Sequence, residues 1–165
     1  MAQWQRVSWM DDDPARLERE LEAMPDVAPE LAWNGRAWSG PAPLWPFDRP
    51  VPSGLAAFVG DRRLTLEITY FESFPMVAPR FTPVDPEPDI AVRTRHEWHV
   101  NGDGSLCMFQ NYSDWDPFST AADLIPKASG WFLEYLLLSS GRIDAMSVGG
   151  IVNDDQHDHR FTDAP

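Results

Sequence analysis

The only cysteine of the chain, Cys107, stands in a segment whose residue types support nucleophilic chemistry. A turn signal, Asn-Gly-Asp-Gly at residues 101–104, directly precedes it, and His96 and His99 lie upstream. Asn-Gly and Asp-Gly favour tight reversals, so we expect the chain to fold back here and present the thiol beyond the bend. A thiol becomes a useful nucleophile near neutral pH when imidazole, backbone N–H or cationic groups favour its thiolate.

Cys107 has a second interpretation, because unpaired cysteine is often buried as a small apolar residue. A cysteine that only packs in the core does not require glycines before it, histidines around it and a second turn after it, and Cys107 has all three. The setting therefore favours a reactive thiol.

Further motifs flank Cys107 in a fixed order: Phe-Pro-Met-Val-Ala-Pro at 74–79, Gly-Ser-Leu-Cys at 104–107 and Trp-Asp-Pro at 115–117. This order resembles the catalytic core of ubiquitin-conjugating enzymes. In that family a Tyr-Pro-Phe-x-Pro-Pro turn, a His-Pro-Asn segment and a Gly-x-Ile-Cys site precede a Trp-x-Pro element. Five positions match the family's spacing: Gly104, Leu106, Cys107, Trp115 and Pro117.

The chain also departs from that family, since it has no His-Pro-Asn. His99 holds the position of the family's asparagine, and His96 is one residue out of register with its histidine. These departures, and the run at 128–135, resemble a divergent bacterial branch found in antiphage operons. The resemblance is greatest to the stand-alone conjugating enzyme of cyclic-oligonucleotide (CBASS) operons, and it covers roughly residues 14–140.

The resemblance implies acyl transfer. Cys107 would take an acyl group from a ThiF-like, ATP-using activating enzyme as a thioester and pass it to an amine. No metal or organic cofactor is implied, because ATP is consumed upstream. The cargo is the C-terminus of a cGAS-like nucleotidyltransferase or of a bacterial ubiquitin-like modifier, and the residues around Cys107 do not separate the two.

Each transfer passes through a tetrahedral oxyanion, for which one placed donor contributes roughly 3–4 kcal/mol. The family assigns that role to the asparagine. His99 can donate a ring N–H there or act as a base, and His96 is the second candidate. For either histidine the alternative is a structural role that fixes the loop.

Four other residues near Cys107 are expected to shape the site. Trp115 and Pro117 are interpreted as walls that position the thiol. Asp103 and Asp114 are candidates for orienting a histidine or an acceptor lysine.

Two other functions remain open. One is a non-catalytic binding module on the same fold, because fold does not fix function. The other is a hydrolase with a Cys–His pair.

Composition limits the function classes. With 165 residues the chain is one domain, and 43% hydrophobic residues suffice for a core. A net charge of −13 argues against a nucleic-acid partner and favours a basic protein partner, with simple solubility as the alternative. One cysteine, no signal-peptide pattern and no apolar run near ~20 residues predict a cytoplasmic protein outside the membrane.

The pattern of elements predicts an α+β fold, and the resemblance makes it the ubiquitin-conjugating (UBC-like) one. We expect an N-terminal helix capped by Asp13, with Arg16 and Glu20 among the charges on its outer faces. In the family this helix helps to dock the activating enzyme, and plain solvation is the alternative. Short strands should follow over 27–55. A further strand is expected over Arg62–Tyr70, with Leu64, Leu66 and Ile68 on one face, and another from Phe81. Together these strands should form an antiparallel four-stranded meander.

After the active-site loop, Ser119 or Thr120 should cap a central helix. Pro126 and Gly130 predict a kink or a short first piece. The face that we expect to pack on the sheet comprises Leu124, Ala128, Trp131, Tyr135 and Leu138.

Too little chain remains for the family's usual C-terminal helices. We expect a catalytic domain at 1–146 and a polar, flexible tail at 147–165. Two histidines in that tail, His157 and His159, lie among acids, and we favour a solvated tail over a metal site there.

Overall fold

The computed structural model of the chain describes residues 8–111 and 114–162. The helices and strands follow one another in this order: α1 (Trp9–Asp12), α2 (Pro14–Val27), β1 (Ala32–Trp33), β2 (Ala37–Pro41), α3 (Leu55–Val59), β3 (Thr65–Thr69), β4 (Arg80–Asp85) and α4 (Ile125–Ser139). No helix within these ranges is long and apolar enough to cross a membrane.

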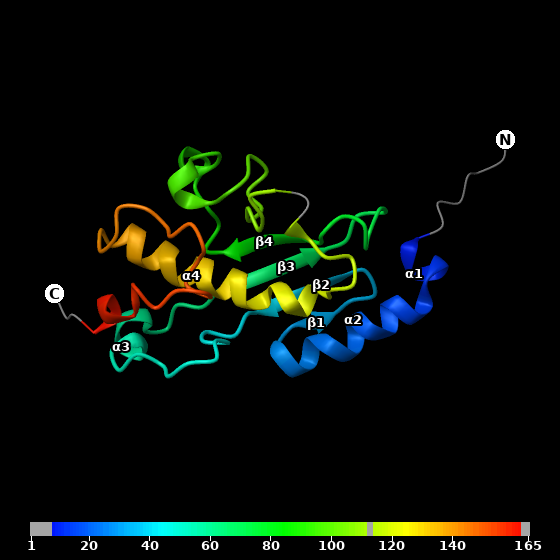
Figure 1. Cartoon of the computed structure of the whole chain (residues 1–165), viewed down its shortest axis with the longest axis horizontal. Helices are drawn as coiled ribbons and strands as arrows, with labels where there is room; N and C mark the ends of the chain where they lie inside the picture. The colour runs from blue at the N-terminus through cyan, green and yellow to red at the C-terminus, as the bar shows by residue number, and fades with distance from the viewer. Residues whose placement is uncertain (1–7, 112–113, 163–165) are drawn as a thin grey trace.

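The four strands form one antiparallel sheet in the order β1-β2-β3-β4. Ile68 pairs with Trp38 on one side and with Phe81 on the other, and all three are buried. Helix α4 lies across one face of this sheet (Figure 1). The expected sequence of N-terminal helix, four-stranded antiparallel sheet and later long helix is therefore confirmed.

Local capping explains where the main helices begin. The Asp13 carboxylate accepts a hydrogen bond from the Arg16 backbone N–H at 3.0 Å, and Pro14 occupies the first helical position of α2. Thr120 and Asp123 form a capping box on a short 3-10 turn, Ala121–Leu124, that leads into α4. The expected short first piece before the long helix is present.

The predicted buried face of α4 was wrong in part. Leu124, Ala128 and Trp131 are buried, but Tyr135 and Leu138 are only partly so. The largest fully buried side chains of α4 lie on the neighbouring stripe, which comprises Ile125, Phe132, Leu133 and Leu137. The reason is that α4 is covered on two sides, by the sheet and by the C-terminal segment.

The C-terminal segment is packed in this structure, whereas its composition predicted a flexible tail. Ile151 and Phe161 belong to the central apolar cluster and are 0% and 2% exposed. Arg49 also forms an ion pair with Asp158 at 2.8 Å. Two apolar side chains are enough to fix an otherwise polar segment, because burial of such groups is strongly favourable. Residues 163–165 of the expected tail lie outside the described residues.

Arg16 and Glu20 of α2 are buried, which corrects the expectation that they face outward. Their exposed fractions are 4% and 1%. One oxygen of Glu20 accepts from the Arg16 guanidinium at 3.1–3.2 Å. The other accepts from the Tyr70 hydroxyl and the Ala121 backbone N–H, both at 2.9 Å. A helical period alone cannot reveal this, because the donors are Tyr70, directly after β3, and Ala121, in the 3-10 turn before α4.

This arrangement predicts a large loss of stability in Glu20→Ala. Removing one partner of a buried ion pair leaves the other charge uncompensated, which costs roughly 3–5 kcal/mol. Glu18→Ala, an exposed position on the same helix, is the matched control. Urea unfolding should show the loss only for Glu20, and equal midpoints for the two variants would contradict this account.

Candidate active site

The chain reverses immediately before Cys107, as its turn signal predicts. Val100 and Leu106 pair as an antiparallel bridge, and Gly104 N–H donates to the Asn101 carbonyl at 3.0 Å. Gly104 has a φ of +86°, and a Cβ there would lie 3.1 Å from the Arg93 guanidinium carbon. Only glycine adopts this backbone without strain, so the residue is required by the turn.

The thiol is presented to solvent because Leu106 and Cys107 lie on opposite sides of the extended backbone after the turn. Leu106 is 4% exposed, and its N–H donates to the Phe81 carbonyl of β4 at 2.8 Å. The next residue, Cys107, is exposed, and its N–H donates to the His99 carbonyl at 2.9 Å. Cys107 is therefore not a buried filler.

The two candidate histidines differ in their surroundings. His99 is half-buried in the left-handed region at the end of a 3-10 turn, His96–Trp98, and its ring lies 5.6 Å from that of His96. Burial, and secondarily the charge of His96, lowers the pKa of His99, so this imidazole is neutral near pH 7. His96 itself is exposed.

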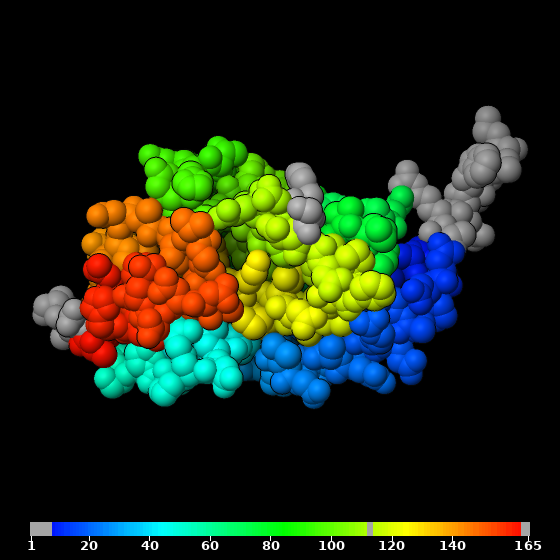
Figure 2. Space-filling view, in the orientation of Figure 1, coloured from blue at the N-terminus to red at the C-terminus, as the bar shows by residue number. Residues whose placement is uncertain are grey.

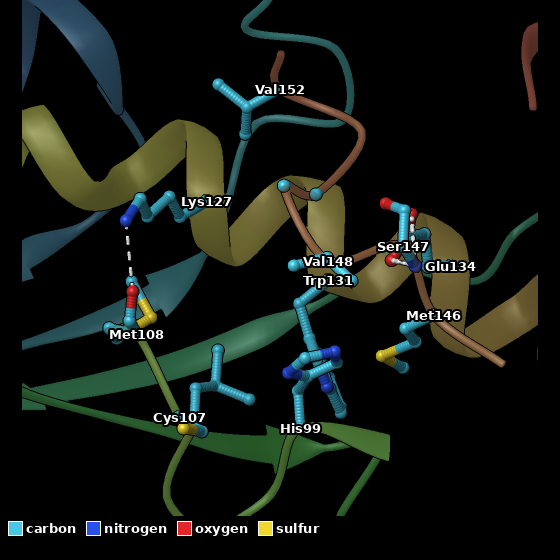
Figure 3. A pocket seen from close by; sticks show the side chains of 13 residues that line it. His99, Cys107, Met108, Lys127, Trp131, Glu134, Met146, Ser147, Val148 and Val152 are labelled. Atoms are coloured by element: carbon cyan, nitrogen blue, oxygen red, sulfur yellow. Dashed lines mark hydrogen bonds between the residues drawn. The ribbon is translucent and has the colours of Figure 1, made fainter. Parts of the chain in front are cut away.

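Cys107 lies on the rim between two hollows, with empty volumes of about 520 and 1220 Å³. The smaller one opens between the active-site loop, α4 and the C-terminal segment, three regions that meet on the face shown in Figure 2. Figure 3 shows His99 and Cys107 on one side of it and Lys127 and Glu134 of α4 on the other, with the Trp131 side chain reaching from α4 toward His99.

The larger hollow lies on the other side of the thiol. Among the residues that line it are Met76, Ala78, Arg80, Asp103 and Trp115. Leu106, Cys107 and Met108 line both hollows. A group bound in either space therefore meets the sulfur.

Trp115 lies where a wall was expected, but Pro117 does not. The indole N–H of Trp115 donates to the Pro75 carbonyl at 2.7 Å, and the residue is 7% exposed. Pro117 lines neither hollow, and its carbonyl accepts from Arg16 of α2 at 2.6 Å. After Trp115 the chain turns away from the thiol toward α2, which explains the difference.

The two aspartates are also placed differently from one another. Asp103 lines the larger hollow and forms an ion pair with Arg80 at 3.5 Å. Hydrogen bonds from Ser105, above all from its hydroxyl, lower the pKa of Asp103. Asp114 lines neither hollow, and its carboxylate accepts from the Asn111 N–H at 3.3 Å. Neither carboxylate contacts a histidine in the described part of the chain.

Lys127, in the first turn of α4, is a residue of the site that sequence reasoning missed. Its ammonium donates to the Met108 carbonyl at 3.0 Å and lies 4.4 Å from the centre of the Phe109 ring. The composition could have drawn attention to this residue, because Lys127 is the only lysine in the chain.

Glu134 is the second residue that was missed, and it fixes the outer wall of the smaller hollow. It is 2% exposed and accepts hydrogen bonds from the backbone N–H and the hydroxyl of Ser147. Burial raises the pKa of Glu134, although the bonds from Ser147 oppose the shift. Nothing local in the sequence indicates this contact, since it joins α4 to a segment that appeared to be a tail.

The remaining histidines do not assemble a metal site in the described ranges, where no three His, Cys, Asp or Glu side chains cluster suitably. His157 lies 4.0 Å from Glu134 instead.

Comparisons of the chain with protein-family models, with curated proteins and with solved structures found no match.

Gly104→Ala should destabilise the active-site turn. A non-glycine residue in this conformation costs about 1–2 kcal/mol. Gly102→Ala in the same turn is the control, because a Cβ there meets only the Thr94 methyl group at an ordinary 3.5 Å. Thermal unfolding should separate the two variants, and equal midpoints would show that the turn tolerates a side chain at residue 104.

The His99 imidazole should titrate below about 6.5, the ordinary pKa of histidine. In His96→Ala the pKa of His99 should rise, because the neighbouring charge is gone, but should stay below the ordinary value because burial remains. NMR titration of the ring protons checks both points. A midpoint at or above the ordinary value in the native protein would contradict the burial seen here.

Proposed function

We propose that this chain is a ubiquitin-conjugating-like acyltransferase that carries its cargo as a thioester on Cys107. The observation that carries the proposal is the exposed thiol on the rim between two hollows, one of which holds the His99 imidazole. A conjugating enzyme needs a nucleophile that the chain end of another protein can reach. Cys107 meets this requirement.

The architecture supports the same proposal. Helix, four-stranded antiparallel meander, loop with cysteine and long helix occur in the order expected for the UBC-like fold. Three motif residues have structural roles around the thiol. Gly104 permits the turn, Leu106 lies in the core, and Trp115 forms part of the wall of the larger hollow. The resemblance to the divergent bacterial branch is thus supported by motif and architecture together.

In the proposed first step, the Cys107 thiolate attacks the carbonyl carbon of a thioester on the activating enzyme. A new C–S bond forms, the old one breaks, and the donor sulfur leaves as a thiolate. In the second step, an amine attacks the new thioester, an amide forms and the Cys107 thiol is regenerated. No metal or organic cofactor enters either step.

His99 is proposed to assist these steps as a neutral imidazole. In this state one ring nitrogen donates and the other accepts. A donor stabilises the oxyanion, and an acceptor takes the proton of the incoming amine. The burial that lowers the pKa of His99 thus keeps both roles available near pH 7.

The larger hollow is proposed to hold the extended end of the cargo. Its apolar wall includes Met76, Ala78 and Trp115, and its Arg80 and Asp103 can hydrogen-bond a peptide backbone. The cargo is the C-terminus of a cGAS-like nucleotidyltransferase, or alternatively of a ubiquitin-like modifier. The net charge of −13 favours such protein partners over nucleic acid.

A hydrolase with a Cys–His pair is less well supported. In such enzymes the imidazole lies within hydrogen-bonding reach of the nucleophile. Here the hydrogen bond of the Cys107 thiol among the described residues goes to the Phe109 carbonyl, at 3.5 Å. This arrangement favours acceptance of an already activated acyl group.

The proposal predicts a reductant-sensitive adduct when the protein is mixed with ATP and a lysate of cells that encode its activating partner. Intact-mass measurement should show the adduct on Cys107 and identify the cargo from its mass. Cys107→Ala should lose the adduct completely, because no other thiol exists in the chain. An equal adduct in that variant would refute the proposed function.

A further inference from the structure

Lys127 is chemically unique among the basic residues of this chain. The other 12 lysine and arginine residues are all arginine. A guanidinium stays protonated in proteins and does not act as an acyl acceptor, whereas a lysine amine does when it is unprotonated. The chain therefore carries a single side chain that can accept an acyl group as a stable amide.

This side-chain amine and the thiol-bearing residue border the same hollow. Lys127 and Cys107 line the same hollow, and the Lys127 side chain points from α4 toward the loop that carries the cysteine (Figure 3). Its nitrogen is held by the carbonyl of Met108, the residue after Cys107, at 3.0 Å. The amine is therefore anchored to the residue that directly follows Cys107 in the chain.

The remaining contacts of Lys127 leave it available for reaction. Its ammonium faces the Phe109 ring and the Met108 carbonyl, and no carboxylate pairs with it in the described part of the chain. A hydrogen bond from the ammonium to a single carbonyl is exchanged more readily than a buried ion pair. The side chain is flexible and only partly buried, so rotation about its own bonds can turn the nitrogen toward the thioester.

We propose that Lys127 is a built-in acceptor that takes the acyl group from Cys107 when no external amine is present. This inference rests on the proposed function, since it requires an acyl group on the thiol. The unprotonated Lys127 amine attacks the thioester carbonyl, the C–N bond forms and the C–S bond breaks. Cys107 leaves as a thiolate and takes up the proton that the nitrogen loses, so no further reactant is needed.

Such a transfer gives the protein a self-modified form. The amide would occupy the hollow beside Cys107, and the freed thiol would lie next to the bound acyl chain. The other basic side chains are arginines, whose guanidinium groups do not accept an acyl group. Among side chains, stable amide formation is thereby confined to Lys127, which lines the same hollow as Cys107.

The test uses the purified chain and a short peptide with a C-terminal mercaptoethanesulfonate thioester as the probe. Thiol exchange should first place the peptide on Cys107 as a reductant-sensitive adduct. A reductant-stable adduct should then accumulate, and peptide mapping should locate it at Lys127. Because the reaction is intramolecular, it should exceed peptide acylation at an introduced distant lysine by ~tenfold or more.

Three variants make the result decisive. Lys127→Arg keeps the charge and should form only the reductant-sensitive adduct. Cys107→Ala should form neither adduct. Lys127→Arg combined with Arg36→Lys, which moves the lysine to an exposed position in the β1–β2 turn, should gain no comparable stable adduct.

The outcomes also separate this inference from the proposed function. A thioester on Cys107 with no amide at Lys127 overturns the inference and leaves the proposed function intact. An equal amide at Lys127 in Cys107→Ala overturns it as well, because the thiol would then play no part. Absence of any thioester on Cys107 overturns both.

Discussion

The opposite orientation of the Leu106 and Cys107 side chains after the 101–104 turn is the constraint on which the candidate site depends. The buried Leu106 side chain and the bond from its N–H to Phe81 fix this strand-like segment on β4. Because successive side chains point to opposite sides, the following residue must face outward. One buried leucine thus places the Cys107 thiol on the surface, and a shift of one residue would bury it.

The second constraint is the burial of the Glu20 carboxylate. Its donors come from α2, from Tyr70 directly after β3 and from the segment before α4, so one side chain connects the three main parts of the fold. Arg16, its ionic partner, also donates to the carbonyls of Pro117 and Ser119. This network positions the chain between Trp115 and α4. It thereby also positions the wall of the larger hollow and the helix that carries Lys127.

The C-terminal segment completes the site. Glu134 holds Ser147, and residues 146–150 together with Val152 line the smaller hollow opposite Cys107. Gly130 of α4 permits the close approach, since a Cβ there would lie 2.7 Å from an Ile151 methyl carbon. A sequence reading that treats this segment as a tail therefore misses one wall of the site, and with it the reason why α4 is buried on two sides.

The sequence by itself determined the local features: the turn before Cys107, the cap at Asp13, the alternation that marks β3 and a cap at Ser119 or Thr120 before the long helix, which the structure places at Thr120 on the preceding 3-10 turn. These depend on residues a few positions apart, whose backbone preferences and hydrogen bonds act before any element packs. Only the tertiary structure decided that Glu20 is buried, that Pro117 faces α2 and that Lys127 borders the thiol. These contacts involve residues that are distant along the chain. Their burial and pairing depend on which helices and strands pack together, and local backbone preferences do not determine that packing.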